Sequence, residues 1–337
     1  MMRVEVKRSF LWNKALGRFQ LVLLLGAGVS SCTPVTSAGV DHTSVTFDLT
    51  PDEEWLAFTS SGGGIYVMNV PSRNVTKVDL QGHHANRVQI SPDGKTLAFI
   101  CSDMEKGGVL CTVPIQGGTM NRLTHDAASS DCWPAFAPDG KSIAFARAKK
   151  CRAYSMGGET WDDYDLWIVD SDGKGLRKIT SSAYYAVSGL TFWLQEGQIV
   201  FSATPHAAKT ADPTLLTVSS LAKEAPRELF PPSLTKSITD PRAWSGYAPV
   251  AGPGDSLAFV SGWDARVWLF QPQGRVVKRI ETSQNVMERP VFAKGGKMYY
   301  FADSGGGSSN VPVYALWSVE AGRRAVLVAP STFFTRP

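Results

Sequence analysis

The sequence has no apolar run long enough to cross a bilayer as a helix near its N-terminus. The candidate there, Leu21–Val29, has about nine residues, whereas a membrane-spanning helix needs roughly 20. Basic residues precede this run, and Ser30, Ser31 and Cys32 follow it. This order predicts a signal peptide over residues 1–31. An unusually short anchor is the alternative.

The sequence also lacks the common catalytic motifs. It has no Gly-x-Ser-x-Gly, no His-Glu-x-x-His and no phosphate-binding glycine loop. Among the innermost strands expected below, Asp48 is the one obvious carboxylate, and a hard cation needs several oxygen ligands. The sequence therefore predicts no catalytic residue, no metal and no cofactor. A metal-dependent hydrolase or lyase acting on a sugar or a lactone is kept as the alternative.

Cysteine is scarce: beyond Cys32 the chain has Cys101, Cys111, Cys132 and Cys151. Their spacing matches no common zinc signature. An even number in an exported protein favours disulfides, and local bridges Cys101–Cys111 and Cys132–Cys151 are preferred among the three possible pairings. Four buried thiols are the alternative.

The chain after residue 31 has a formal net charge of zero. Residues 1–31 hold five of the 34 basic residues and one of the 30 acidic residues, so the remainder has 29 of each. Phosphate binding needs an excess of Lys and Arg. No nucleic-acid partner is therefore expected.

What the chain does have is an internal repeat. Val88–Phe99 and Pro134–Phe145 both read as an apolar strand, a Pro-Asp-Gly-Lys turn and a second apolar strand. Four degenerate copies lie at Thr46–Phe58, Leu190–Phe201, Pro249–Phe259 and Pro290–Phe301. Each copy precedes a third strand-like run and a short edge strand. Six units of four strands predict an all-β, six-bladed β-propeller of antiparallel blades.

The predicted organisation has four segments. Residues 1–31 are the signal peptide, and residues 32–44 are a tether or a strand that closes the ring. The propeller occupies residues 45–328, and residues 329–337 form a tail. Trp167, Trp268 and Trp317 on the third strands are expected in the core.

The repeat carries a family resemblance. Ser91-Pro-Asp-Gly-Lys95, Leu166-Trp-Ile-Val-Asp170 and Arg122-Leu-Thr124 resemble the TolB propeller repeat over nearly the whole mature chain. The same repeat occurs in propellers of prolyl-oligopeptidase-type enzymes. About a dozen residues separate Cys32 from the first repeat, so the α/β domain that precedes the TolB propeller is expected to be absent. No α/β-hydrolase domain is expected after residue 328.

A second resemblance concerns the N-terminus. Val29-Ser-Ser-Cys32 is similar to the lipobox of bacterial lipoproteins, in which the cysteine is acylated and becomes the first mature residue. Several acyl chains on Cys32 would anchor the protein stably. In that family, an Asp directly after the cysteine favours retention in the inner membrane. This chain has Thr33 at that position, so the resemblance implies an outer-membrane lipoprotein facing the periplasm. A plain signal peptide is the alternative.

The long connections of this chain fall on one face of the predicted propeller. They include Ala148–Tyr164, read as a loop between the second and third strands of blade 3. Recognition commonly uses such loops. The residues expected to form a binding face there are His83, His84, His125, Asp131, Trp161, Asp162, Asp163, Tyr164, Trp263 and Asp264. The alternative is that these Asp side chains cap turns and the aromatic rings pack under loops.

These observations favour a non-catalytic envelope lipoprotein that binds a protein or another ligand. Its expected partners are an envelope protein or a cell-wall-associated ligand, together with the membrane through the lipid anchor.

Overall fold

The computed structural model describes most of the chain after residue 44. The described ranges are 45–60, 62–102, 107–153, 159–193, 197–208, 213–221, 224–230, 245–262, 264–272, 276–282, 285–286, 288–303, 314–320, 323 and 326–329. Several predicted features lie outside these residues: the signal peptide, the expected acylation site Cys32, the segment 32–44 and Trp263. No helix within the described ranges is long and apolar enough to span a membrane.

Each repeat folds into one four-stranded antiparallel sheet, so the predicted six-bladed propeller is confirmed. The strands of the first three blades follow one another along the chain. They are β1 (Phe47–Leu49), β2 (Trp55–Thr59), β3 (Ile65–Asn69), β4 (Val75–Lys77), β5 (His84–Ile90), β6 (Thr96–Ser102), β7 (Val109–Pro114), β8 (Asn121–Arg122), β9 (Ser130–Phe136), β10 (Ser142–Ala153), β11 (Glu159–Asp170) and β12 (Arg177–Lys178).

Blades 4 to 6 repeat this order, with one short 3₁₀ helix, η1 (His206–Ala208), in blade 4. Their strands are β13 (Ala186–Phe192), β14 (Gln198–Thr204), β15 (Thr214–Ser219), β16 (Arg227–Glu228), β17 (Gly246–Ala251), β18 (Leu257–Ser261), β19 (Val267–Gln271), β20 (Val276–Ile280), β21 (Val291–Phe292), β22 (Met298–Asp303), β23 (Tyr314–Val319) and β24 (Val326–Ala329). The last strand ends one residue beyond the predicted limit at residue 328.

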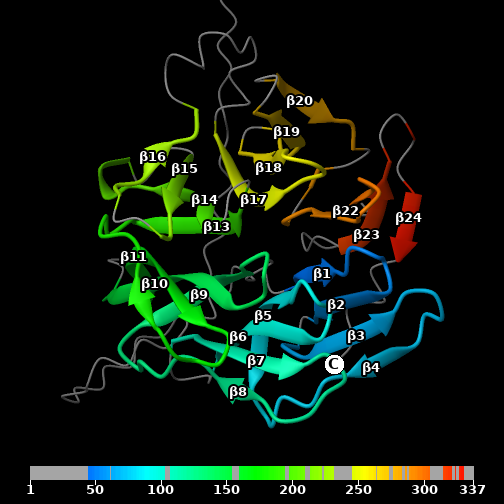
Figure 1. The fold of residues 1–337 in the computed structure, drawn as a ribbon, viewed down its shortest axis with the longest axis horizontal. Coiled ribbons are helices and arrows are strands. Elements are labelled where there is room, and N and C mark those ends of the chain that lie inside the picture. Colours follow the sequence, from blue (N-terminus) through cyan, green and yellow to red (C-terminus); the bar gives the residue numbers. More distant parts are fainter. Residues whose placement is uncertain are drawn as a thin grey trace, which may run out of the picture. The chain divides into compact units, whose positions relative to one another are not determined.

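The first strand of each blade lies innermost, and the short fourth strand lies at the outer edge (Figure 1). The burial pattern agrees with this order. Strand β9 has three buried residues and no exposed one, whereas the fourth strands β8, β12 and β16 are exposed at both of their residues.

The Pro-Asp-Gly turns join the first two strands through specific hydrogen bonds. In blade 2, Asp93 Oδ1 accepts from Ser91 Oγ at 2.6 Å and from the backbone N–H of Lys95 at 3.1 Å. Gly94 has φ +71°, in the left-handed region that glycine adopts without steric cost. The hydrogen bond from Ser91 is the main reason that the pKa of Asp93 is lowered. The turn is therefore built as its sequence predicts.

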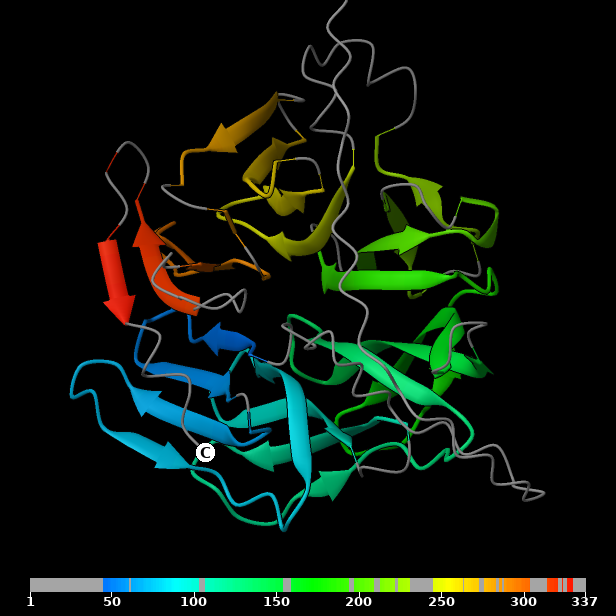
Figure 2. The same cartoon turned by 180° about the vertical axis from the view of Figure 1, so that it is seen from behind.

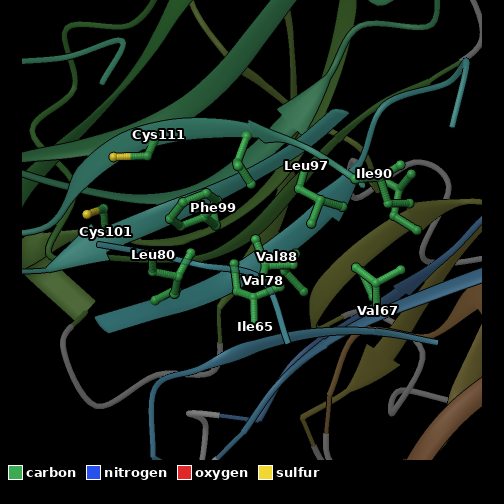
Figure 3. Packing of buried hydrophobic residues seen from close by; sticks show 14 residues of the cluster. Ile65, Val67, Val78, Leu80, Val88, Ile90, Leu97, Phe99, Cys101 and Cys111 are labelled. Carbon is green, nitrogen blue, oxygen red and sulfur yellow. The ribbon is translucent and has the colours of Figure 1, made fainter. Parts of the chain in front are cut away.

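The core consists of apolar layers between neighbouring blades. One such layer joins Ile65 and Val67 of blade 1 to Val88, Leu97 and Phe99 of blade 2 (Figure 3). Phe99 and Leu97 are fully buried. Because each sheet is covered by its neighbours, no single repeat can bury its apolar faces alone.

The ring closes by side-chain packing between blades 1 and 6, which lie side by side in both views (Figures 1 and 2). The rings of Phe47 and Phe301 meet edge to face, with centroids 4.6 Å apart. The N–H of Lys294 donates to the carbonyl of Pro51 at 2.7 Å. Both blades obtain their four strands from their own repeats, so blade 6 does not require residues 32–44 as a fourth strand.

The predicted loop at Ala148–Tyr164 is wrong for most of its length. Strands β10 and β11 continue through it as a long hairpin, with Ala153 paired to Glu159.

The structure does not show the preferred disulfide pairing: Cys101, Cys111 and Cys132 form no disulfide there. The strand register explains this result. Cys101 lies opposite Val109, and Cys111 lies opposite Phe99, so the two cysteines are diagonal neighbours, beyond the usual reach of a disulfide. Cys132 pairs with Ala146, five residues along β10 from Cys151, which is about 17 Å of strand.

Candidate functional site

One position in each repeat faces the centre of the ring. The turn between the first and second strands is closed by a backbone hydrogen bond, which in blade 2 runs from the N–H of Ser91 to the carbonyl of Thr96. The position lies four residues before the donor of this bond. The residues at this position in blades 1 to 6 are Thr46, Arg87, Trp133, Gly189, Ala248 and Arg289. Those of blades 2 to 5 have φ between +52° and +115°, and the strand register shifts beside each of them.

Four of these positions, Thr46, Arg87, Trp133 and Arg289, line a hollow at one mouth of the central channel. Its lining comes from blades 1, 2, 3, 4 and 6 and includes Thr46, Phe47, Arg87, Val88, Gln89, Trp133, Pro134, Leu190, Glu288 and Arg289. The volume of the hollow is about 20 Å³, enough for about one water molecule. Because the innermost strands start here, this mouth lies on the face to which the inter-blade connections belong.

Arg87 and Trp133 form the most specific contact at the mouth. The guanidinium carbon of Arg87 lies 3.6 Å from the centroid of the Trp133 ring, a close cation–π contact. Trp133 Nε1 donates to the carbonyl of Val187 at 2.8 Å, which holds the indole in place. Arg87 Nη1 also donates to Glu288 Oε2 at 3.3 Å. Arg87 thus links blades 2, 3 and 6.

A second ion pair lies beside the first. Arg289 Nη2 is 3.1 Å from Asp48 Oδ1, and Asp48 Oδ2 accepts from the N–H of Ile90 at 2.8 Å. Burial raises the pKa of Asp48, and the charge of Arg289 opposes this rise. The carboxylate singled out in the sequence is therefore a bridge between blades 6, 1 and 2.

Asp131, expected on the binding face, is instead a buried structural residue. It is 2% exposed and forms a two-point ion pair with Arg147. Thr124 Oγ1 also donates to it at 2.6 Å. The structure favours the alternative role for this residue.

The predicted group on β11 comes together around Asp163. Lys150 Nζ and His206 Nε2 both contact its carboxylate, the latter at 2.8 Å. Lys150 is the main reason that the pKa of Asp163 is lowered. The ligand atoms of Asp162, Asp163 and His206 lie within 4.8 Å of one another, so these residues could offer oxygen and nitrogen to a metal.

The backbone explains how two successive Asp residues reach one cluster. Successive side chains of a strand point to opposite faces, but Asp163 has φ +56°, which is rare for a non-glycine residue. Both Asp162 and Asp163 are buried, whereas Trp161 and Tyr164 are half-buried. His206, from η1 of blade 4, was not singled out in the sequence.

The predicted histidines lie apart from this cluster. His83 contacts Arg122 through Nε2 and Nη2 at 3.2 Å, and His84 Nδ1 lies 3.2 Å from the carbonyl of Gly62. His125 is exposed between β8 and β9. Asp264, in the turn before β19, accepts from the N–H of Arg266 through Oδ1 at 3.2 Å. Its Oδ2 atom is buried without a hydrogen bond in the described chain.

The opposite face, which carries the Pro-Asp-Gly turns, has two grooves. A groove of about 500 Å³ lies between blades 1 and 2, and one of about 470 Å³ lies between blades 2 and 3. Both are lined by Pro92 and Asp93. The Asp side chains there already complete the turns, as Asp93 does.

Four residues of the mouth were not predicted from the sequence: Arg87, Trp133, Glu288 and Arg289. Aligning the six repeats on their turns would have placed three of them in one column. Glu288 precedes that column by one residue, so the same alignment would have found it next to Arg289.

Comparison with solved structures agrees with the TolB-like propeller that the repeat predicts. A TolB structure from Agrobacterium tumefaciens superposes with a TM-score of 0.55 and 21% identity, covering 75% of this chain and 86% of that one. TolB from Acinetobacter baumannii gives a TM-score of 0.53 and 15% identity, covering 82% of this chain and 60% of that one. The chain therefore has a TolB-like six-bladed propeller fold.

The same fold also occurs in an enzyme. The oligogalacturonate lyase of Vibrio parahaemolyticus gives a TM-score of 0.54 with 11% identity, covering 86% of this chain and 80% of that one. No family model and no curated protein matches the sequence. At these identities the similarity establishes the architecture of the chain, and its function must be argued from its own residues.

Proposed function

We propose that this protein is a non-catalytic envelope lipoprotein whose propeller binds an envelope protein or a cell-wall-associated ligand at the channel mouth. The observation that carries the proposal is the hollow to which five blades contribute, with Arg87 stacked on Trp133 at its edge. Arg and Trp are enriched in the residues that dominate binding energy. The TolB-like fold supports a role with a protein partner.

The binding proposal is tested by photo-crosslinking in intact envelopes. A benzophenone amino acid at Gln89, which lines the hollow, should capture a discrete partner. The same group at Leu221, 70% exposed on the outer part of blade 4, is the matched control. Capture of no partner from position 89, or of the same products from both positions, would contradict the proposal.

The membrane part of the proposal rests on the Val29-Ser-Ser-Cys32 motif. Cys32→Ser should abolish acylation and release the protein into the soluble fraction. Membrane association unchanged by this substitution would refute the lipid anchor while leaving the binding role open to its own test.

The alternative function is a metal-dependent hydrolase or lyase acting on a sugar or a lactone. The cluster of Asp162, Asp163 and His206 is the observation that favours it. The contact between Lys150 Nζ and Asp163 weighs against it, because a lysine ammonium already neutralises this carboxylate. Metal analysis of the purified protein distinguishes the two functions: a stoichiometric divalent ion lost in Asp163→Asn would favour the enzyme.

A further inference from the structure

The contacts of Arg87 leave most of its hydrogen-bonding capacity unused. A guanidinium carries five N–H donors, and Glu288 accepts from one of them in the described part of the chain. Their distance of 3.3 Å is longer than the roughly 2.7–2.9 Å typical of charge-assisted hydrogen bonds. The Arg87 side chain is 17% exposed, so its remaining donors are within reach of a molecule that enters the mouth.

Stacking on Trp133 restricts the plane of this guanidinium. Because the indole is itself held by the carbonyl of Val187, Arg87 can present its N–H edge in one orientation. A fixed planar fork matches the two oxygens of a carboxylate. Little side-chain entropy then remains to be lost when such a group binds.

Arg289 adds a second positive charge beside the first. Among the described residues, Arg289 forms an ion pair with Asp48. The two arginines together offer more hydrogen-bond donors than the two facing carboxylates use. The mouth is therefore rich in donors, and an acceptor group is the complementary ligand.

The walls and the size of the hollow further restrict which acceptor groups can bind. Phe47, Val88 and Leu190 contribute apolar surface, and a low dielectric strengthens an ionic hydrogen bond. A volume of about 20 Å³ takes little more than one oxygen-sized group, so only the tip of a ligand enters the hollow and the rest of the ligand lies outside it.

We infer, on the basis of the proposed function, that the channel mouth recognises an acidic side chain of a protein partner and that Arg87 is the specificity-determining residue. The partner's carboxylate takes the free N–H edge of Arg87, and Glu288 competes with it for the guanidinium.

The inference is tested with two blocked peptides, acetyl-Ala-Glu-Ala-amide and its Gln counterpart, added to the full mature protein. Binding is followed by NMR of the Trp133 indole N–H, assigned with Trp133→Phe. The Glu peptide should bind at least tenfold more tightly than the Gln peptide. Equal affinities would overturn the inference.

Two substitutions separate recognition from a structural role. Arg87→Lys keeps the charge but removes the fork, and should weaken Glu-peptide binding about tenfold. Glu288→Gln removes the competitor, and should strengthen it several-fold. Arg227→Lys, on the exposed edge strand β16, is the matched control and should change nothing. A melting curve for each variant confirms folding, and unchanged affinity in folded Arg87→Lys would overturn the role of Arg87.

Glucuronate, with glucose as its neutral counterpart, tests the other source of a carboxylate. Tighter binding of glucuronate than of the Glu peptide would overturn the assignment to a protein side chain. The result of the peptide test can be distinguished from the result of the crosslinking test of the proposed function. A partner crosslinked at position 89 without Glu-over-Gln preference removes the inference alone, and the preference without any crosslinked partner removes the proposed function alone.

Discussion

The carboxylate of Asp131 receives two hydrogen bonds from the guanidinium of Arg147, at 2.6 Å from Nε and 3.0 Å from Nη2. The two residues face each other across β9 and β10 and are 2% and 3% exposed. Removing one partner of such a pair leaves a buried charge without compensation.

Asp131→Asn should therefore lower the free energy of unfolding by about 3 kcal/mol, measured by urea denaturation. Asp172→Asn is the matched control, because Asp172 forms an exposed pair with Lys174 and surface pairs contribute about 0–1 kcal/mol. Equal effects of the two substitutions would show that the buried pair is not a stability determinant.

Tyr247 provides a prediction about alkaline pH. Burial, helped by the charges of Glu288 and Asp264, raises its pKa from 10.0 to about 12. The unfolded chain then ionises first, so this contribution to stability is fully present below about pH 10 and is lost as the pH rises toward about 12. Two pKa units correspond to about 2–3 kcal/mol.

Tyr247→Phe should flatten this part of the pH profile, measured as unfolding free energy from about pH 9 to about pH 12. A variant that loses stability as steeply as the wild type over this range would show that another group causes the alkaline loss.

The seam between blades 1 and 6 provides a third prediction. Phe301 is fully buried there and packs against Phe47. Phe301→Ala should cost about 3–5 kcal/mol of unfolding free energy. Val326→Ala, on the 62% exposed Val326 of β24, should cost less than about 0.5 kcal/mol. A small effect of the first substitution would mean that the ring tolerates an open seam.

The thiols of blades 2 and 3 provide a fourth prediction. Burial raises the pKa of Cys132 to about 12, so its thiol stays protonated and unreactive near neutral pH. Iodoacetamide should label Cys132, Cys101 and Cys111 slowly in the native protein and fully after unfolding without reductant. Mass spectrometry of the labelled peptides checks this. No labelling of the unfolded, non-reduced protein would instead indicate disulfides.

The sequence predicts most of the fold because each repeat carries its own turn chemistry. Asp93 and Gly94 form the turn that their order indicates, and every blade follows the same template. Of the three tryptophans expected in the core, Trp268 is buried, whereas Trp167 and Trp317 are half-buried. The long hairpin of β10 and β11 was missed because its length depends on the pairing of the two strands, which continues to Ala153 and Glu159.

The channel mouth was not predicted, because its residues come from repeats far apart in the chain. Arg87 and Glu288 are 201 positions apart, and no local pattern brings them together. Asp131 was misplaced for a related reason: an Asp near a loop can serve binding or structure, and its pairing with Arg147 depends on strand register. His206 meets Asp163 through packing between two blades, which the sequence does not encode locally.

Closure of the ring without a shared strand has a mechanical consequence. Force applied through the chain before Val45 acts on blade 1, and the seam with blade 6 resists mainly through apolar side chains and the Lys294–Pro51 hydrogen bond. No ladder of backbone hydrogen bonds runs across that seam between the described strands. Under tension the ring should therefore peel open at blade 1 at low force, with blades 2 to 5 still folded.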